Sequence, residues 1–227
     1  METKEDLEKW YATPDPWKTE NSVEDRVRSD ILLQYVRYGQ FKHALDIGCG
    51  EGALTARLAP FVEKTDGFDL SETAVGRAKA RGIANANFFA MDMRDVDMLE
   101  SRYDLVLCSE VLYYLTEDAD RRAMFAKIRK VMQPTGVFLL SVIIVGQTDW
   151  RRYFTYEEGL SLLREHFRVV TAMPNAVRRD ARTSTTEKAL RAIGRIIPSM
   201  QQNIRHYVTV STPPENAYQL TYVAIPR

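Results

Sequence analysis

The sequence predicts an α/β protein whose core is one mostly parallel sheet with helices on both of its faces. Apolar runs alternate with helix-forming stretches along the chain, which is the order of successive βαβ units. Strands joined in this way run parallel, and the connecting helices cover the two faces of the sheet. The 227 residues can enclose one full hydrophobic core, so we expect a single domain.

Each element follows from a short local pattern. Ser71 is a favoured first residue for the helix that follows it, and Pro134 ends the helix that precedes it. The expected strands cover residues 43–47, 65–70, 87–91, 103–108, 136–145, 167–173 and 218–225. The expected helices cover residues 23–38, 53–59, 71–82, 118–132 and 155–166.

One segment interrupts this alternation. About 44 residues separate the sixth expected strand from the last, where a tight connection needs only a few. Residues 174–210 hold seven Lys or Arg and two acidic residues, and an expected helix over 186–197 has Leu190, Ile193 and Ile197 along one face. The segment is interpreted as a helical excursion on the surface, or as a lid, a dimer arm or a receiver of an anionic substrate.

Composition excludes several classes of protein. The formal net charge is zero, so no overall field attracts nucleic acid or an anionic membrane. The longest apolar run, 137–145, is too short to span a bilayer, and the polar N-terminus lacks the apolar region of a secretory signal. Cys49 and Cys108 are expected to be buried free thiols. The three histidines are scattered and the cysteines are distant, so we expect no metal site. Because the thiols are free and no secretory signal is seen, we expect a cytoplasmic protein.

A glycine-rich turn follows the first strand. Residues 45–52 read Leu-Asp-Ile-Gly-Cys-Gly-Glu-Gly, so an apolar strand reaches an acidic residue and then three alternate glycines. Glycines let the backbone turn sharply and let a ligand lie against the main chain. Asp69 ends the second strand, 19 residues after Gly50, where a carboxylate can accept hydrogen bonds from ribose hydroxyls. A dinucleotide and a sulfonium nucleoside both fit these features.

Three further features separate the two cofactors. Asp46 stands beside the glycine turn, where it suits an ammonium group and would repel a pyrophosphate. Asp92 ends the third strand, in a position to accept a hydrogen bond from an adenine amino group. The fourth strand ends at Ser109, and an apolar, aromatic loop follows it. Together these features favour a nucleoside that carries an ammonium group over a dinucleotide.

In order and spacing, residues 40–145 resemble the class I S-adenosylmethionine-dependent methyltransferases. The resemblance implies a Rossmann-like, seven-stranded sheet with an antiparallel last strand, and S-adenosyl-L-homocysteine as the product of the cofactor. In that family Gly48 and Gly50 would pass close to the methionine part and Asp46 would hold it. Asp69 would bind the ribose. The remaining cofactor residues implied are Leu70 against the adenine, Asp92 and Met93 at its edge, Ser109 near the methyl group, and Glu110.

The flanks allow a narrower interpretation. The segment Asp15-Pro16-Trp17, with Arg26 after it, resembles the start of the nodulation-type N-methyltransferases, which methylate an amino sugar, and the run 110–115 is similar to theirs. Residues 92–95 resemble the sugar-amine dimethyltransferases of antibiotic pathways. These resemblances imply an amine on a small molecule, such as an amino sugar, as the acceptor. The first alternative is O-methylation of a saccharide hydroxyl or a carboxylate. The second is a protein that binds S-adenosylmethionine without catalysing a reaction.

Nucleic acid is disfavoured as the acceptor. The chain lacks the Asn-Pro-Pro-Tyr or Asp-Pro-Pro-Tyr motif that DNA and protein amide methyltransferases carry after the fourth strand, although the basic insertion keeps an RNA interpretation open.

The chain is expected to divide into an N-terminal helical lid (1–40), a cofactor-binding core (41–173), a basic helical insertion (174–215) and a final strand (216–227). The insertion is the candidate homodimer contact.

Few residues could act in catalysis, because the sulfonium donor is already activated and the main task is alignment. Tyr113 and Tyr114 follow the methyl-donor loop, where one would pack and the other would hydrogen-bond the acceptor. His206 is the candidate base if the insertion folds over the site. Trp17 is expected to close over the cofactor, with a cation–π attraction for its sulfonium, or else to pack the first helix. Arg26 is expected to reach the cofactor carboxylate, or else to be a solvated charge.

Overall fold

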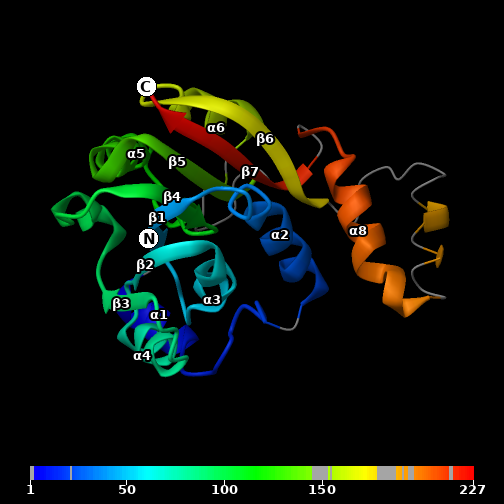
Figure 1. Ribbon diagram of the computed structural model, residues 1–227, viewed down its shortest axis with the longest axis horizontal. Helices are drawn as coiled ribbons and strands as arrows, with labels where there is room; N and C mark the ends of the chain where they lie inside the picture. Colours follow the sequence, from blue (N-terminus) through cyan, green and yellow to red (C-terminus); the bar gives the residue numbers. More distant parts are fainter. Residues whose placement is uncertain are drawn as a thin grey trace.

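The computed structural model describes residues 3–20, 22–144, 153, 155–177, 188–190, 192–193, 197–214 and 217–227. They form one seven-stranded sheet in the order β3-β2-β1-β4-β5-β7-β6 (Figure 1). The strands β1 to β5 pair in parallel, whereas β7 is antiparallel to both of its neighbours. The Rossmann-like fold with an antiparallel last strand is therefore confirmed.

The strands are β1 (Phe41–Ile47), β2 (Val62–Asp69), β3 (Ala86–Ala90), β4 (Tyr103–Ser109), β5 (Met132–Ile143), β6 (Phe167–Val177) and β7 (Ala217–Pro226). The α-helices are α1 (Lys4–Trp10), α2 (Val23–Leu33), α3 (Ala53–Leu58), α4 (Glu72–Ala80), α5 (Asp118–Val131), α6 (Tyr156–Leu163) and α8 (Gln201–Val210). Short 3-10 helices are η1 (Ala59–Phe61), η2 (Met93–Met98), η3 (Leu112–Tyr114) and η4 (Pro198–Met200).

The alternation of side chains along β4 shows how the sheet is covered. Leu105 and Leu107 pack in one cluster with residues of α2 and α3, whereas Val106 and Cys108 pack in the other cluster with residues of α5 and α6. Successive strand residues point to opposite faces, so both faces of the sheet are buried. Cys108 and Cys49 are buried free cysteines, as the sequence predicts.

Four elements differ from the sequence-based expectation. Helix α1 was not expected; it begins at a capping box in which Thr3 and Asp6 satisfy each other's backbone amides. Strand β5 begins at Met132, directly after α5 and before Pro134, because Met132 pairs with Tyr103 across an irregularity in the ladder. Strand β6 continues to Val177, and α8 follows the region where one helix was expected. That helix was expected over residues 186–197. Within this range the structure describes 188–190 and 192–193, which are helical, and residue 197, which is not.

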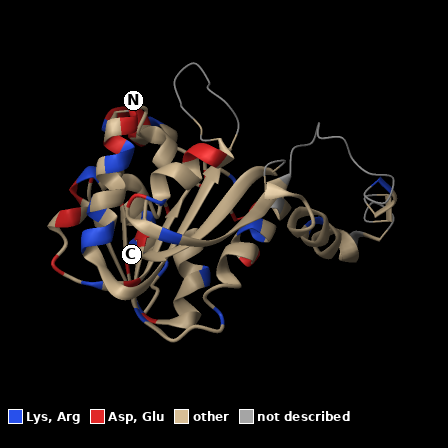
Figure 2. Cartoon of the chain, turned by 90° about the horizontal axis from the view of Figure 1, so that it is seen from above, with Lys and Arg blue, Asp and Glu red and all other residues tan. Residues whose placement is uncertain are grey.

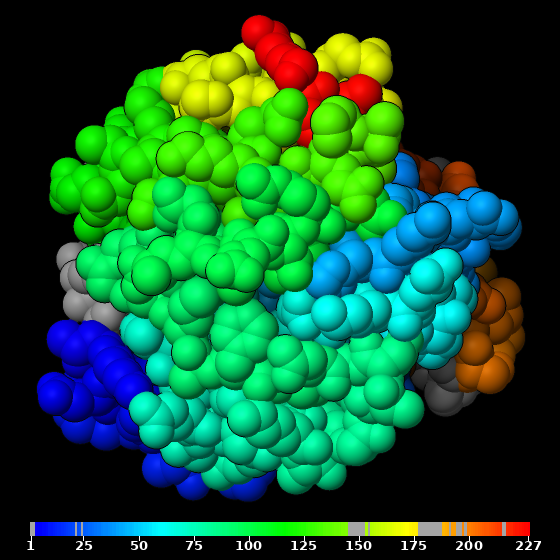
Figure 3. Space-filling model, turned by 60° about the vertical axis from the view of Figure 1, so that its left-hand side comes forward, coloured from blue at the N-terminus to red at the C-terminus, as the bar shows by residue number. Residues whose placement is uncertain are grey.

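The helical additions to the sheet lie far apart, at opposite ends of the molecule (Figure 1). Helix α8 packs against α2 and β6, at the outer side of the body (Figure 1). The N-terminal segment, which we define as residues 3–20, lies against α4 and is seen in blue beside it in Figure 3. Charges of both signs are interspersed over the helices of the body (Figure 2). Within the described ranges, no helix combines the length and apolar character needed to cross a membrane.

Candidate functional site

A cavity of about 730 Å³ lies at the carboxyl ends of the parallel strands. Its walls come from the N-terminal segment, α2, the glycine turn after β1, and the residues that end β2, β3 and β4. The lining continues to Ile143 of β5 and Gln219 of β7. Open α/β sheets bind ligands at this edge, near the point where the strand order reverses, which here lies between β1 and β4. The cavity therefore spans the sheet from β3 to β7.

The glycine turn needs its glycines. Gly48, Gly50 and Gly52 all have positive φ, at 70°, 54° and 76°. A side chain at Gly48 would also collide with Val111, because an added Cβ would lie 2.3 Å from its Cγ1. Non-glycine residues rarely adopt this conformation, so the backbone itself forms the wall of the cavity here.

Asp46 lies directly beneath this turn, almost fully buried. Its Oδ2 accepts a 2.6 Å hydrogen bond from the Thr55 hydroxyl of α3. Burial raises the pKa of the Asp46 carboxyl to about 6, although the bond from Thr55 favours the charged form. A carboxyl group so placed gains from a bound cation, because a nearby positive charge restores its ionised form.

Asp69 ends β2 and is held by the main chain. Its two oxygens accept 3.0 Å hydrogen bonds from the backbone amides of Gly50 and Ser71. Burial raises the pKa of the Asp69 carboxyl, and these backbone bonds oppose the rise. The carboxylate is thus fixed in one orientation at the cavity wall, beside Leu70.

Asp92 stands after β3, at the start of η2. It accepts a hydrogen bond from the backbone amide of Arg94, and the Arg94 side chain pairs with both of its oxygens. That hydrogen-bonded guanidinium holds the pKa of Asp92 below its usual range, so the group is a charged acceptor. Met91 and Met93, the neighbours of Asp92 in the sequence, also line the cavity and give this part of its wall an apolar surface.

The N-terminal segment covers this half of the cavity. Tyr11 is buried, and the rings of Trp10 and Trp17 stack with centroids 5.2 Å apart. The segment is tied down by Asp15, whose backbone amide donates to the Glu51 carboxylate. Trp17 lines the cavity, as expected, and so does Tyr11.

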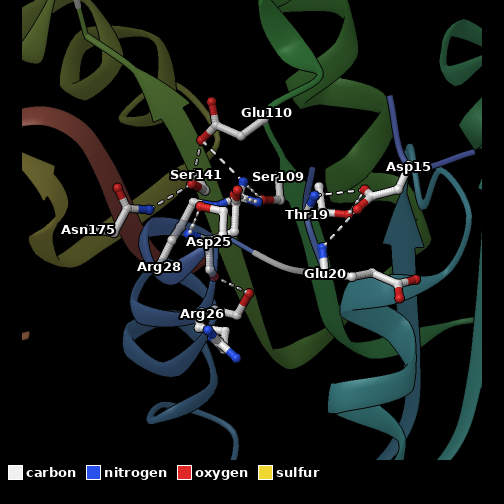
Figure 4. Close-up of polar contacts among 12 residues, drawn as sticks. Asp15, Thr19, Glu20, Asp25, Arg26, Arg28, Ser109, Glu110, Ser141 and Asn175 are labelled. Carbon is white, nitrogen blue, oxygen red and sulfur yellow. Dashed lines mark hydrogen bonds and ion pairs between the residues drawn. The ribbon is translucent and has the colours of Figure 1, made fainter. Parts of the chain in front are cut away.

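A second group of charges lies at the opposite end, between α2 and the end of β4 (Figure 4). Arg28 pairs with Asp25 at 2.7 Å, donates to the Ser109 hydroxyl at 3.2 Å, and lies 3.9 Å from Glu110 Oε1. The Ser141 hydroxyl of β5 donates to the same oxygen of Glu110 at 2.7 Å. We call Asp25, Arg28 and Glu110 the acidic triad, because its two carboxylates outnumber its one guanidinium.

Aromatic side chains form the wall beside this triad. Tyr113 and Tyr114 both line the cavity, and their rings lie 5.0 Å apart. Tyr153 meets Tyr113 edge-on, with ring centroids 5.2 Å apart. The predicted aromatic pair therefore lines the cavity beside the acidic triad, beyond the end of β4.

His206 and Arg26 differ in their relation to the cavity. His206 lies on α8, which packs on α2 and β6, and it is not among the described residues that line the cavity. The insertion therefore does not carry His206 over the site, and we assign it no step. Arg26 lines the cavity from α2 with an exposed side chain.

Two residues of the site were not singled out from the sequence. These are Arg28 and Asp25 of α2. The spacing of Asp25 and Arg28, three residues apart on one helix, was the available signal for an ion pair. The buried Leu32 one turn after Arg28 shows that this side of α2 faces the protein, so the pair is not on the solvent side.

Comparison with known proteins agrees with this geometry. A family model described as Nodulation protein S (NodS) matches residues 1–171. The nodulation protein S of Sinorhizobium fredii is 28% identical over 163 residues, which are 70% of this chain and 75% of that protein. The nodulation protein S of Azorhizobium caulinodans is 28% identical over 168 residues, which are 72% of this chain and 80% of that protein.

Solved structures share the fold over nearly the whole chain. The crystal structure of the N-methyltransferase NodS from Bradyrhizobium japonicum in complex with S-adenosyl-L-homocysteine has a TM-score of 0.73 at 20% identity, covering 98% of this chain and 97% of that chain. A 1,6-didemethyltoxoflavin-N1-methyltransferase from Burkholderia thailandensis has a TM-score of 0.67 at 22% identity, and the match covers 98% of this chain and 86% of that chain. With the family model matching well over half of its length, this chain belongs to the NodS family of class I S-adenosylmethionine-dependent methyltransferases.

Proposed function

We propose that this methyltransferase transfers the methyl group of S-adenosylmethionine to an amine of a small molecule, and that the acceptor is an amino sugar. The observation that carries the proposal is the arrangement of one cavity with two chemically different ends. One end presents the glycine turn and three separate carboxylates, and the other presents the acidic triad and the tyrosine pair. The N-methyltransferase NodS of Bradyrhizobium japonicum, whose fold this chain shares, supports the amine.

The donor would lie along the first of these ends. Asp69 would accept hydrogen bonds from the ribose hydroxyls, and Asp92 would accept one from the adenine amino group. Leu70 and Met93 would hold the adenine between apolar surfaces. The methionine part would then lie over Gly48 and Gly50, with Asp46 beneath its ammonium group and Arg26 near its carboxylate. This order places the sulfonium methyl group near Ser109.

The acceptor would reach the methyl group from the second end of the cavity. Methyl transfer from a sulfonium needs the acceptor atom in line with the carbon–sulfur bond, and fixed placement supplies most of the acceleration. Tyr113 and Tyr114 would hold a sugar ring and keep water away. The acidic triad carries one more negative than positive charge when both of its carboxylates are ionised, which favours a cationic amine over a neutral hydroxyl.

Three other assignments belong to the proposal. The N-terminal segment acts as a lid over the donor, and the protein works in the cytoplasm. The insertion at 174–215 joins two copies; Ile193, Ile197 and Tyr207 are exposed apolar side chains of its described part. Equilibrium sedimentation tests the dimer, and a monomer at high concentration would contradict it.

Calorimetry and mass spectrometry test the main proposal. S-adenosyl-L-homocysteine is expected to bind the wild-type protein, and a screen with glucosamine, a glucosamine tetramer, glucose and small carboxylates is expected to show one added methyl group on the amines. Absence of binding would overturn the donor assignment. Methylation of glucose but not of glucosamine would establish the O-methyl alternative instead.

A further inference from the structure

Glu110 has one carboxylate oxygen that is held and one that is not. Oε1 accepts a hydrogen bond from Ser141 and lies near Arg28. Oε2 is buried and meets no hydrogen-bond donor in good geometry among the described residues, although the Gln219 side chain approaches the carboxyl group. A buried carboxylate oxygen without a partner is costly, and its presence in a residue of the cavity wall indicates a ligand that satisfies it.

The neighbouring hydrogen bonds decide which oxygen takes up a proton. The Asn175 amide donates to the Ser141 hydroxyl at 2.8 Å (Figure 4). It also donates to the Thr221 hydroxyl at 2.9 Å. Because the Ser141 oxygen accepts that hydrogen, its own single proton is donated to Glu110 Oε1. A proton that reaches Glu110 therefore resides on Oε2.

The backbone of Glu110 is held in a strained conformation. Its φ is 61°, in the left-handed region that side chains other than glycine rarely adopt, and its amide donates to the carbonyl oxygen of Ser141 at 2.9 Å. Strand β5 thus holds both the main chain and the side chain of this residue. Strain of this kind persists where surrounding contacts enforce it, and it is common at active sites.

We infer that Glu110 binds the acceptor amine and removes its proton through Oε2, an inference that rests on the proposed function. The ammonium proton moves to Oε2, and the freed nitrogen lone pair forms a bond to the methyl carbon. The carbon–sulfur bond breaks, and its electron pair remains on sulfur. The products are the methylated ammonium, S-adenosyl-L-homocysteine and protonated Glu110, which returns its proton to water after the products leave.

The electrostatic surroundings suit this role. Burial raises the pKa of the Glu110 carboxyl, and Arg28, Ser141 and Gln219 partly oppose the rise. Asp25 acts in the same direction as burial, and the Cys108 thiol of β4 is the other titratable group near the carboxylate. A base with a raised pKa takes a proton more readily near neutral pH. Before the proton moves, the excess negative charge of the triad attracts the ammonium form of the acceptor.

The substitution Glu110→Gln tests the inference with glucosamine as the acceptor. We expect kcat/KM to fall about 100-fold at pH 7, and the deficit to shrink to about tenfold near pH 9, where glucosamine loses its proton to water. Affinity for S-adenosyl-L-homocysteine is expected to stay within about twofold, since Glu110 is assigned to the acceptor. The exposed Glu100→Gln is the matched control, with wild-type rates at both pH values.

Several outcomes overturn the inference. One is a Glu110→Gln variant with near wild-type kcat/KM, and another is a deficit that is equal at both pH values. A parallel loss of S-adenosyl-L-homocysteine affinity would place Glu110 in the donor site. A wild-type protein that binds S-adenosyl-L-homocysteine but methylates none of the amines would instead overturn the proposed function, and this inference with it.

Ser141→Ala provides a second test that does not remove the carboxylate. The hydrogen bond from Ser141 favours the charged form of Glu110, so its loss raises the pKa of that carboxyl further. We expect the acid limb of the kcat/KM profile to move to higher pH, with a plateau within about threefold of the wild type. A purely structural role of Ser141 would lower the rate equally at every pH, and that result would overturn the inference.

Discussion

The two ends of the cavity, which the proposed function assigns to the donor and to the acceptor, are built in different ways. At the donor end, Asp69 is held by backbone amides of two turns that are close to it in space, and the glycine turn is itself backbone. At the acceptor end, Glu110 is held by side chains from α2 and β5, and Asn175 of β6 supports it from behind. The donor end is thus fixed by main-chain geometry, and the acceptor end depends on side chains from distant parts of the chain. A change of acceptor needs only side-chain substitutions, whereas the donor end tolerates few.

Gly48→Ala is expected to have the largest effect, because Gly48 joins the two ends through its contact with Val111. The added Cβ would be strained by the positive φ and would collide with that side chain, so we expect a loss of roughly 3 kcal/mol in the free energy of unfolding. Urea denaturation measures it. Gly82→Ala, with a φ of +63° and open space around its Cβ, isolates strain alone and should cost about 1 kcal/mol. Equal losses for the two variants would contradict the assigned collision.

Asp69→Asn is expected to separate the two ends most clearly. The amide cannot accept from ribose and from both backbone amides in the same way, so affinity for S-adenosyl-L-homocysteine should fall by roughly 2 kcal/mol, or about 30-fold. Calorimetry measures the change, and Glu110→Gln serves as the comparison from the acceptor end. If both variants lose the same affinity, the division into donor and acceptor ends is wrong.

Asp46 is expected to give the donor end a pH-dependent stability. Its pKa is about 6 in the folded protein, against the ordinary value of 3.8, so the folded state binds the extra proton between these values. The free energy of unfolding should therefore fall as the pH rises from about 4 to about 6 and then stay level, because the unfolded chain ionises first. Asp46→Asn removes this cost and should stabilise the ligand-free protein by roughly 1–2 kcal/mol at pH 8.

Thermal unfolding of Asp46→Asn at pH 4.5 and pH 8 provides the check. The gain should be much larger at pH 8 than at pH 4.5, and affinity for S-adenosylmethionine should fall in the same variant. The exposed Asp95→Asn is the control. A stabilisation of equal size at both pH values would show that ionisation of Asp46 is not its cause.

Removing the contact between the N-terminal segment and Glu51 is expected to have the smallest effect. Glu51 accepts from the Asp15 amide and pairs with Arg77 at 2.5 Å. Glu51→Gln should weaken the lid by about 0.5–1 kcal/mol and speed the release of S-adenosyl-L-homocysteine about threefold. Stopped-flow release measures it, with Glu63→Gln on the exposed side of β2 as the control. An unchanged release rate would show that the segment does not limit exit.

The same contrast explains what the sequence could predict. Local patterns predict the seven strands, the glycine turn, Asp69 and Asp92. Each of these features depends on residues that are close together in the sequence. Strand β5 begins earlier than expected because Met132 pairs with Tyr103 before an irregularity in the ladder, a long-range contact that the local sequence around Pro134 does not reveal. Helix α8 shows no comparable local signal, and it packs on distant elements.

The acceptor end could be predicted only in part. Ser109, Tyr113 and Tyr114 are close together in sequence, and they were found. The partner that holds Glu110, Ser141, lies 31 residues away, and Asn175 lies 34 residues further on. Such a network depends on the order of strands in the sheet, which a single sequence specifies only through the complete fold.

The stacked indoles of the N-terminal segment give the proposed lid an optical signal. The chain has three tryptophans, and two of them, Trp10 and Trp17, form this stack while the third, Trp150, lies outside the described residues. Trp10 is 47% exposed and Trp17 is 37% exposed, so both indoles are sensitive to quenchers in water. Opening and closing over the donor should therefore change the intrinsic emission of the protein. The molecule carries its own fluorescent reporter of cofactor exchange, and no label has to be attached to follow it.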